Sequence, residues 1–516
     1  MRIRKLLRVR FVVYSFTEQE KIMAELTPMM QKYMETKEQY KDCILFYRLG
    51  DFYEMFFDDA IVASKELEIA LTGKSCGLEE RAPMCGIPYH AVETYLARLV
   101  SRGYKVAICE QVEDPKLAKG LVKREVIRVV TPGTNLDVQS LEASKNNYLM
   151  CIAYTSDGIG ISAADVTTGD YYVTEVEDLR KLKDELMKYE PSEIICNEAF
   201  LVSGYDVEDL KSRLHMSVSS LESHMFDDDG CRRILMRHFK VNTLIGLGVE
   251  EFPTGVLAAG ALLQYLYDTQ KTDLEHFTHI SPYLTSKYML LDSSTRRNLE
   301  LTETLREKQK RGSLLWVLDK TKTAMGGRLL RNYIEQPLID KEEMEKRLDA
   351  IQELNQDSIS RDEIREYLNP VYDLERLLSK VTYKTANPRD LIAFRNSLQM
   401  LPPIKTVLSG FQKEELAAIR EEIDGLEDIY QLIDEAIVEE PPISIREGGM
   451  IKDQFDETID HLRAAKHDGK QWLVQLEEED RERTGIKNLK IKKNNVFGYF
   501  FEVTNSYKDL VPEDYI

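Results

Sequence analysis

The first domain of this 516-residue chain is best approached through the run Ile44-Leu45-Phe46-Tyr47-Arg48-Leu49-Gly50-Asp51-Phe52-Tyr53-Glu54. Its apolar beginning is typical of a strand, and Gly50-Asp51 is a turn signal. Alternate side chains of an extended segment share a face, so Phe52 and Glu54 should lie on one side, about 7 Å apart, and Tyr53 on the other. The run therefore predicts a ring and a carboxyl side by side.

Two interpretations of this pair are open. A flat ring beside a hydrogen-bonding carboxyl suits a protein that wedges into a stack of bases and holds the disturbed base. The alternative is purely structural, because strand aromatics usually pack in the core and a neighbouring Glu usually faces water. The rest of the sequence has to decide between them.

Length and composition favour a globular protein of several domains. At about 150 residues per domain, 516 residues predict three or four domains. Apolar residues make up 43% and charged residues 31%, which indicates a folded, soluble chain. No run approaches the roughly eighteen apolar residues of a membrane span. Residues 1–22 resemble a signal peptide but lack its apolar length and cleavage site, so we expect a cytoplasmic protein folded from Met23 onward.

The cysteines predict reduced, mostly buried thiols. Their number is odd and none are spaced C-x-x-C. Cys76, Cys85 and His90 do not have the spacing of zinc ligands, so we expect no metal site. The seven cysteines are residues 43, 76, 85, 109, 151, 196 and 231.

The net charge of −20 argues against a protein that coats nucleic acid by charge alone. Local basic surfaces remain possible, because screening limits electrostatic attraction to about 10 Å. Two segments concentrate lysine and arginine, residues 98–128 and residues 487–493.

Residues 24–130 alternate short apolar runs with helical spacing, which predicts a mixed α/β domain. Thr131-Pro132-Gly133-Thr134-Asn135 interrupts it and predicts a linker that extends to residue 147. A second α/β unit follows. It should begin as an antiparallel meander, because Ser156-Asp157-Gly158 and Thr168-Gly169-Asp170 join apolar runs. Helical spacing at residues 177–189 and 231–239 completes it.

Helical periodicity prevails from about residue 255. The expected helices span residues 305–333, 341–354, 374–381, 388–401 and 414–436. From residue 455 onward, apolar side chains recur every three or four positions and predict a stem about 40 Å long. Gly485 should end it.

A β-hairpin is expected beyond the stem, with Lys490 and Lys492 alternating with apolar residues and a tight turn at Asn494-Asn495. Lysine and asparagine at its tip suit a grip on a phosphate backbone. Alternatively, the lysines only protect an edge strand from aggregation. No helix returns along the stem before Ile516, so its apolar stripe stays uncovered and we expect the chain to be incomplete.

Apparent nucleotide motifs fail on inspection. Gly73-Lys74-Ser75 resembles the end of a P-loop, but Glu68 stands where the first glycine belongs. Gly469-Lys470 is followed by Gln471, and Gly158-Ile159-Gly160 lies in the expected hairpin instead of opening a helix. No arrangement typical of nucleophilic catalysis occurs either. We expect no catalytic centre in this sequence.

Blocks of sequence in a fixed order extend over nearly the whole chain from Met23 to Ile516. They include Phe46-Tyr47-Arg48-Leu49-Gly50-Asp51-Phe52-Tyr53-Glu54, Met84-Cys85-Gly86-Ile87-Pro88-Tyr89-His90-Ala91 and Leu291-Asp292-Ser293-Ser294-Thr295-Arg296-Arg297-Asn298-Leu299-Glu300. The others are residues 108–111, 129–134, 326–330, 373–376, 481–485 and 495–499. Together they resemble the MutS family of bacterial DNA mismatch-recognition proteins, which residues 1–22 do not match.

The resemblance implies a multidomain fold, α/β plus α. The expected parts are an unmatched extension (1–22), a mixed α/β mismatch-binding domain (23–137), a ribonuclease-H-like connector (138–282), a mostly helical lever domain (283–456) and a truncated clamp with a β-hairpin (457–516).

The resemblance also implies residue roles: Phe52 would stack on a mispaired base and Glu54 would hydrogen-bond it. Every base has a π-face and unstacking costs least where pairing is poor, so selectivity would come from deformability. A purine N7 only accepts hydrogen bonds, so Glu54 would have to be protonated to bond it. Candidates for the DNA backbone are Arg98, Lys490, Lys492, Lys493, Asn494 and Asn495.

Members of the family carry a C-terminal ATPase domain with a P-loop, and this sequence ends before it. We therefore expect no enzyme activity and no cofactor here, with ATP, Mg²⁺ and stable homodimerisation only in the full-length protein. The implied partners are DNA duplexes with mismatches or small loops and a MutL-type protein, at the bacterial nucleoid and without a membrane. Two alternatives are a helical interaction scaffold without DNA binding and a nucleotide-dependent enzyme, which the absent P-loop disfavours.

Overall fold

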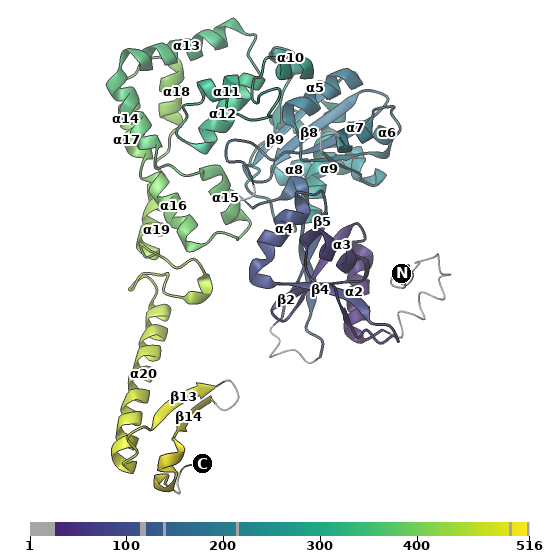
Figure 1. Ribbon diagram of the computed structural model, residues 1–516. Coiled ribbons are helices and arrows are strands. Elements are labelled where there is room, and N and C mark those ends of the chain that lie inside the picture. Colours follow the sequence, from purple (N-terminus) through teal and green to yellow (C-terminus); the bar gives the residue numbers. More distant parts are fainter. Residues whose placement is uncertain are drawn as a thin grey trace. The chain divides into compact units, whose positions relative to one another are not determined.

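The computed structural model describes residues 26–113, 120–137, 141–212, 216–494, 498–512 and 515 (Figure 1). The chain divides into two compact units. The first unit comprises Met1–Ala386 with Asn396–Gly425, and the second Asn387–Arg395 with Leu426–Ile516. Among the described residues, no helix combines the length and apolar character needed to cross a membrane.

The first domain is built on a six-stranded sheet with the order β3-β4-β2-β1-β5-β6. Only β1 and β5 pair in parallel; the other neighbours are antiparallel. The mixed α/β character predicted for this segment is confirmed. The strands are β1 (Cys43–Leu49), β2 (Phe52–Phe56), β3 (Thr72–Lys74), β4 (Ala82–Pro88), β5 (Lys105–Gln111) and β6 (Arg124–Val130).

Helices cover both faces of this sheet. On one face α2 (Pro28–Gln39) packs through Met30 and Tyr33, and on the other lie α3 (Phe57–Leu67) and α4 (Val92–Val100). The carboxylate of Asp59 ties three elements together, since it accepts the Leu45 N–H at 2.9 Å and pairs with Lys37 Nζ at 2.9 Å. Burial raises the pKa of Asp59 above its usual value.

The first residues of the segment expected to be a linker are largely buried. Thr131 and Thr134 are fully buried, and a short helical turn runs over Pro132–Thr134. The reason is a buried carboxylate: Glu193 accepts hydrogen bonds from the Thr131 hydroxyl, from Gly133 N–H at 3.2 Å and from the Tyr265 hydroxyl at 2.7 Å. Residues 131–135 thus pack around Glu193, and the linker expected over residues 131–147 stays a prediction.

The second domain holds another six-stranded sheet, with the order β11-β10-β7-β8-β9-β12. The meander predicted from its two turns is confirmed, because β7, β8 and β9 pair antiparallel. The strands are β7 (Leu149–Tyr154), β8 (Ile159–Asp165), β9 (Asp170–Val176), β10 (Glu193–Cys196), β11 (Ser217–Ser220) and β12 (Ser281–Pro282).

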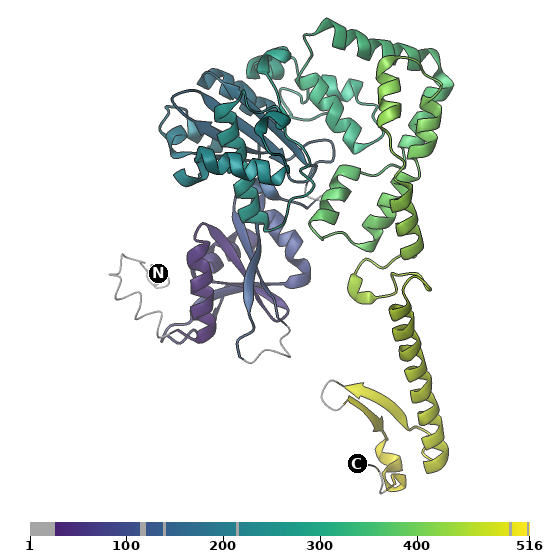
Figure 2. The same ribbon diagram turned by 180° about the vertical axis from the view of Figure 1, so that it is seen from behind.

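Two sets of helices cover the second sheet, one on each face (Figure 2). One face carries α8 (Asp228–His238) and α9 (Pro253–Gln270), and the other α5 (Leu179–Tyr189), α6 (Glu198–Leu201) and α7 (Val207–Ser212). The backbone of α9 reaches the sheet at Gly160, where a Cβ would lie 1.9 Å from the Thr254 carbonyl oxygen. Gly160 thus serves close packing of helix on strand.

The helical part of the first unit is more divided than its periodicity predicted. Residues 305–333 do not form one helix, because Gly312 has φ +98° and Ser313 caps a new start by accepting the Trp316 N–H at 3.2 Å. Residues 414–436 likewise split at Leu426, whose φ is +49°. The helices are α10 (Ser293–Asn298), α11 (Leu314–Leu318), α12 (Ala324–Glu335), α13 (Lys341–Gln356), α14 (Ser358–Leu368), α15 (Leu374–Thr382), α16 (Pro388–Leu398), α17 (Leu401–Leu408) and α18 (Glu414–Glu422), with α16 crossing into the second unit.

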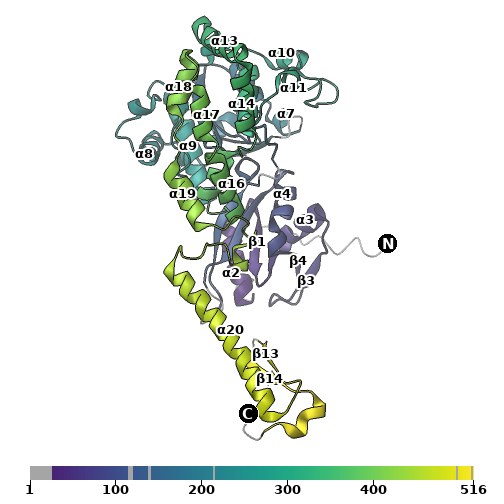
Figure 3. The same ribbon diagram turned by 90° about the vertical axis from the view of Figure 1, so that its left-hand side faces the viewer.

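The second unit contains α19 (Glu427–Ala436), the long helix α20 (Glu457–Thr484) and a hairpin of β13 (Lys490–Asn494) and β14 (Gly498–Glu502) (Figure 3). The predicted stem and its end are confirmed: α20 has 28 residues, and Gly485 caps it with φ +70°. Arg481 Nε donates to the Leu489 carbonyl at 2.8 Å, which holds the start of the hairpin against the last turns of α20.

Candidate nucleic-acid interface

The turn between β1 and β2 places Phe52 at the first position of β2. Leu49 pairs with Phe52, so Gly50-Asp51 form a two-residue turn, and Gly50 supplies the positive φ of +58°. The Phe52 side chain is 47% exposed, whereas Tyr53 is only 5% exposed. The predicted alternation is confirmed, and the ring is not packed in the core.

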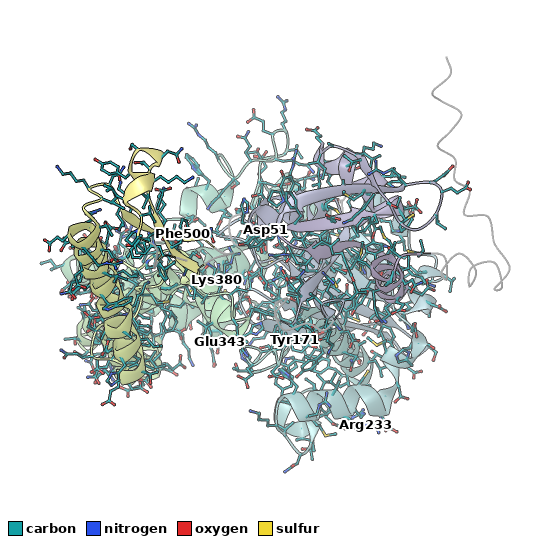
Figure 4. The ribbon with its side chains drawn as sticks, turned by 90° about the horizontal axis from the view of Figure 1, so that it is seen from below. Asp51, Tyr171, Arg233, Glu343, Lys380 and Phe500 are labelled. Carbon is teal, nitrogen blue, oxygen red and sulfur yellow. The ribbon has the colours of Figure 1, made fainter. Side chains whose placement is uncertain are left out.

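The backbone of this turn is fixed from both sides. The Tyr89 N–H donates to the Asp51 carbonyl at 3.0 Å, and Arg48 Nε donates to the Gly50 carbonyl at 2.5 Å. Arg124 Nε donates to the Arg48 carbonyl at 2.7 Å. Asp51, which precedes Phe52, is labelled in Figure 4. The turn therefore presents Phe52 from a rigid base.

A carboxylate beneath the turn completes this support. Glu110, on β5, accepts a hydrogen bond from the Tyr53 hydroxyl and pairs with Arg48 Nη1 at 3.1 Å. The Arg48 guanidinium carbon also lies 3.9 Å from the centre of the Tyr89 ring, a cation–π contact. Burial, and then the bond to Glu110, raise the pKa of the Tyr53 phenol well above its usual value, so Tyr53 acts as a neutral donor.

Glu54 follows on the same face as Phe52, and it already has a partner. Lys74, at the end of the edge strand β3, brings its Nζ within 2.5 Å of Glu54 Oε2. Gly86 on β4 is the cross-strand neighbour of Glu54, and a Cβ there would lie 3.5 Å from Glu54 Cγ and 3.8 Å from Phe52 Cδ1. The missing side chain at Gly86 leaves the face beside the ring and the carboxyl open.

The structure does not bring Arg98 to this face. Arg98 lies on α4, which packs on the opposite side of the sheet, and its Nη1 donates to the Leu67 carbonyl at 3.3 Å. Its side chain therefore helps to join α4 to the end of α3.

The candidate lysines of the hairpin are exposed. Lys492 pairs with Glu502 at 2.7 Å, and Lys493 Nζ lies 5.2 Å from the centre of the Tyr499 ring. Lys490 is exposed, Asn494 is half-buried at the end of β13, and Asn495 lies outside the described residues. Phe500 on β14 is labelled in Figure 4. The described hairpin thus presents a mixture of ammonium groups and rings.

Reasoning from the sequence missed Lys74, Glu110 and Gly86. Lys74 was considered only as the remnant of a P-loop, because Gly73-Lys74-Ser75 has that local pattern. Its pairing with Glu54 joins residues twenty positions apart on non-neighbouring strands, which no local pattern reveals. A signal for Gly86 existed in its place between the apolar residues of β4, where glycine often marks a close approach.

Neither metal chemistry nor thiol chemistry has support in the part of the chain that the structure describes. No cluster of His, Cys, Asp or Glu there could hold a metal ion. The seven cysteines are free and buried, as predicted. Burial raises the pKa of the Cys43, Cys85 and Cys109 thiols to about 12, which keeps them protonated and unreactive.

Comparison with known proteins matches three family models in order along the chain. MutS domain I matches residues 27–139, MutS domain II residues 147–280 and MutS domain III residues 294–510.

Several curated proteins align with this chain over most of its length. The DNA mismatch repair protein MutS of Lachnoclostridium phytofermentans is 65% identical over 494 residues, which are 96% of this chain and 53% of that protein. The proteins of the same name from Ruminiclostridium cellulolyticum and Acetivibrio thermocellus are 54% and 52% identical, each over 96% of this chain and 57% of their own length. The chain thus spans about half the length of these relatives. With three consecutive domain models and such identity, the chain belongs to the MutS family.

Proposed function

We propose that this chain recognises mispaired bases and small loops in duplex DNA, as an early step of DNA mismatch repair. The observation that carries the proposal is the exposed Phe52 ring, fixed on a rigid turn beside the Glu54 carboxyl. The names of the similar proteins support it, since each is a DNA mismatch repair protein.

The energetics of a wedge favour faulty pairs. Stacking of a base on an aromatic side chain contributes about 1–3 kcal/mol, whereas opening a base step costs a few kcal/mol. The two free energies nearly cancel at a sound base pair. Insertion of the Phe52 ring is therefore favourable only where pairing and stacking are already weak. A ring offers no sequence-specific contacts, and the deformability of the DNA would set the preference.

Glu54 would then hold the disturbed base. It lies on the same face as Phe52 and opposite Gly86, which has no side chain to block access, so the edge of a displaced base could reach its carboxyl. To bond an acceptor such as a purine N7, Glu54 would have to carry a proton; to bond a base N–H, it would accept as a carboxylate.

The other parts of the chain receive the roles that the resemblance implies. The second domain would be a ribonuclease-H-like connector, the helical region a lever, and α20 with its hairpin part of a clamp. In the clamp, Lys490, Lys492 and Lys493 would contact the DNA backbone, together with Asn494 and Asn495. Flexible ammonium groups suit such contacts, which position a protein without reading sequence.

The remaining family properties are proposals for the whole protein. By the resemblance these are ATP and Mg²⁺ binding with ATPase activity, homodimer formation, a MutL-type partner, and a place in the bacterial cytoplasm at the nucleoid. The chain spans 53% to 57% of the relatives compared above.

A competition assay tests the mismatch proposal. The chain would compete for a labelled duplex with one mismatch against unlabelled mismatched and perfect duplexes. Phe52→Ala should weaken binding to the mismatch about fivefold to 150-fold, which corresponds to the loss of about 1–3 kcal/mol of stacking. Binding to the perfect duplex should change much less, because phosphate contacts dominate it.

A matched control is available in Phe455→Ala. Phe455 is 42% exposed, close to the 47% of Phe52, and lies before α20 at the end remote from the hairpin. It should leave both affinities unchanged. Mismatch preference that survives in Phe52→Ala would refute the wedge, and a chain that binds neither duplex would favour the interaction scaffold.

A further inference from the structure

The ion pair of Lys74 and Glu54 occupies the place where recognition is proposed to occur. Lys74 reaches from the edge strand β3 to β2, where its Nζ lies 2.5 Å from Glu54 Oε2 and 5.5 Å from the centre of the Phe56 ring. The two side chains are 34% and 18% exposed. Lys74 is thus the more exposed partner, and Glu54 is largely covered, on the face that carries Phe52.

The pairing with Lys74 reduces the repulsion between Glu54 and the phosphates of DNA. An unpaired carboxylate beside Phe52 would repel the phosphates of any duplex that approached the ring. The ammonium of Lys74 neutralises Glu54 and removes that repulsion. Because Glu54 is largely covered, Lys74 would leave it only when the carboxylate gains a proton or another partner, and the 34% exposed Lys74 side chain could then turn outward.

A hydrogen bond from Glu54 to a base would weaken the ion pair between Glu54 and Lys74. If Glu54 takes up a proton to bond an acceptor on a base, it no longer offers a charge to Lys74. If it accepts a base N–H instead, the base competes with Lys74 for the same oxygens. In both cases the ammonium loses its partner, and the nearest new anions would be the phosphates of the bound duplex.

We propose that Lys74 pairs with Glu54 in the free protein and on perfect DNA, and moves to a backbone phosphate when Glu54 engages a mispaired base. The proposal rests on the proposed function. It makes Lys74 a specificity-determining residue, since one additional phosphate contact forms only on the mismatch.

The exchange has a measurable signature in the salt dependence of binding. Each phosphate that a protein neutralises on B-DNA steepens the slope of log Kobs against log salt concentration by about 0.9. The unaltered chain should therefore show a steeper slope on a mismatched duplex than on the perfect duplex of the same length. The two slopes should differ by about 0.9, the contribution of one phosphate contact.

The test compares three variants of the chain by salt titration on both duplexes. Lys74→Met leaves Glu54 unpaired on both duplexes, so the readout is the difference between the slopes on mismatched and perfect DNA, which should fall by about 0.9. Glu54→Gln frees Lys74 and should raise the slope on perfect DNA by about 0.9. Lys65→Met, at an exposed lysine of α3 on the opposite face of the sheet, should alter neither slope and serves as the control for lost charge.

The outcomes separate this proposal from the proposed function. If Lys74→Met lowers both slopes equally, Lys74 is a permanent phosphate contact, and if it lowers neither, it touches no phosphate; each result overturns the exchange. Either result, combined with a mismatch preference that is lost in Phe52→Ala, leaves the proposed function standing. A chain with no mismatch preference at all overturns both.

Discussion

Removal of the Tyr53 hydroxyl tests whether Phe52 depends on the support beneath it. In the variant Tyr53→Phe the ring keeps its place in the core, where Tyr53 is 5% exposed, but the hydrogen bond to Glu110 is lost. Glu110 retains its pair with Arg48 at 3.1 Å and the Gln111 N–H at 3.0 Å. The substitution thus removes one bond and leaves no charge unpaired.

The expected magnitude follows from this geometry. A hydrogen bond to a charged group contributes about 1.5–3 kcal/mol. The lower end applies here, because Glu110 is 24% exposed at its side chain and keeps two other partners. A loss of about 1.5 kcal/mol in the free energy of local opening corresponds to roughly tenfold faster amide exchange in β2. Mismatch affinity should fall several-fold, since the ring is then less firmly held.

Hydrogen exchange followed by mass spectrometry on the whole chain measures this effect. The control is Tyr367→Phe, which deletes an equivalent phenol–carboxylate bond, from Tyr367 to Glu363 Oε1 at 3.0 Å, on an exposed face of α14. It should leave exchange in β2 unaltered. Unchanged exchange of the β2 amides in Tyr53→Phe would refute the idea that this network holds the turn.

Two further predictions concern the stability of the domains. Gly160→Ala should destabilise the second domain by about 3 kcal/mol in denaturant unfolding, the upper end of the usual cost of overpacking, because its Cβ would lie 1.9 Å from the Thr254 carbonyl oxygen. Gly246→Ala, whose Cβ would have no atom within 4 Å, is the control. The Cys43, Cys85 and Cys109 thiols have pKa values raised by burial from 9.0 to about 12, so the stability of the first domain should be complete below pH 9 and decline between pH 9 and 12. An unfolding midpoint in guanidinium that is equal or higher at pH 10 than at pH 7.5 would contradict this sign.

Local patterns predicted those features that local forces decide. The alternation of Phe52, Tyr53 and Glu54 follows from the period of a strand, and the Asp-Gly and Gly-Asp turns of the second domain follow from the backbone freedom of glycine. The end of α20 at Gly485 was predictable for the same reason.

Features that depend on distant partners were not predictable in this way. Thr131 and Thr134 read as linker residues because they are polar, yet the Glu193 carboxylate, some sixty residues away in the chain, makes their burial possible. Lys74 and Glu110 became part of the site only through strand order, which a single sequence does not reveal. The helical breaks at Gly312 and Leu426 interrupt an apolar periodicity that continues across them.

The pinned Gly50-Asp51 turn has a consequence for how a search along DNA would proceed. A loop that had to order itself at each site would lose conformational entropy at each encounter and slow the inspection of every base step. Here folding has already fixed the backbone through the Tyr89 N–H and the Arg48 side chain. If the proposed function holds, a turn that is already ordered would test each base step without first folding. The residence time at a site would then depend on how easily the DNA deforms there and not on a rearrangement of the protein.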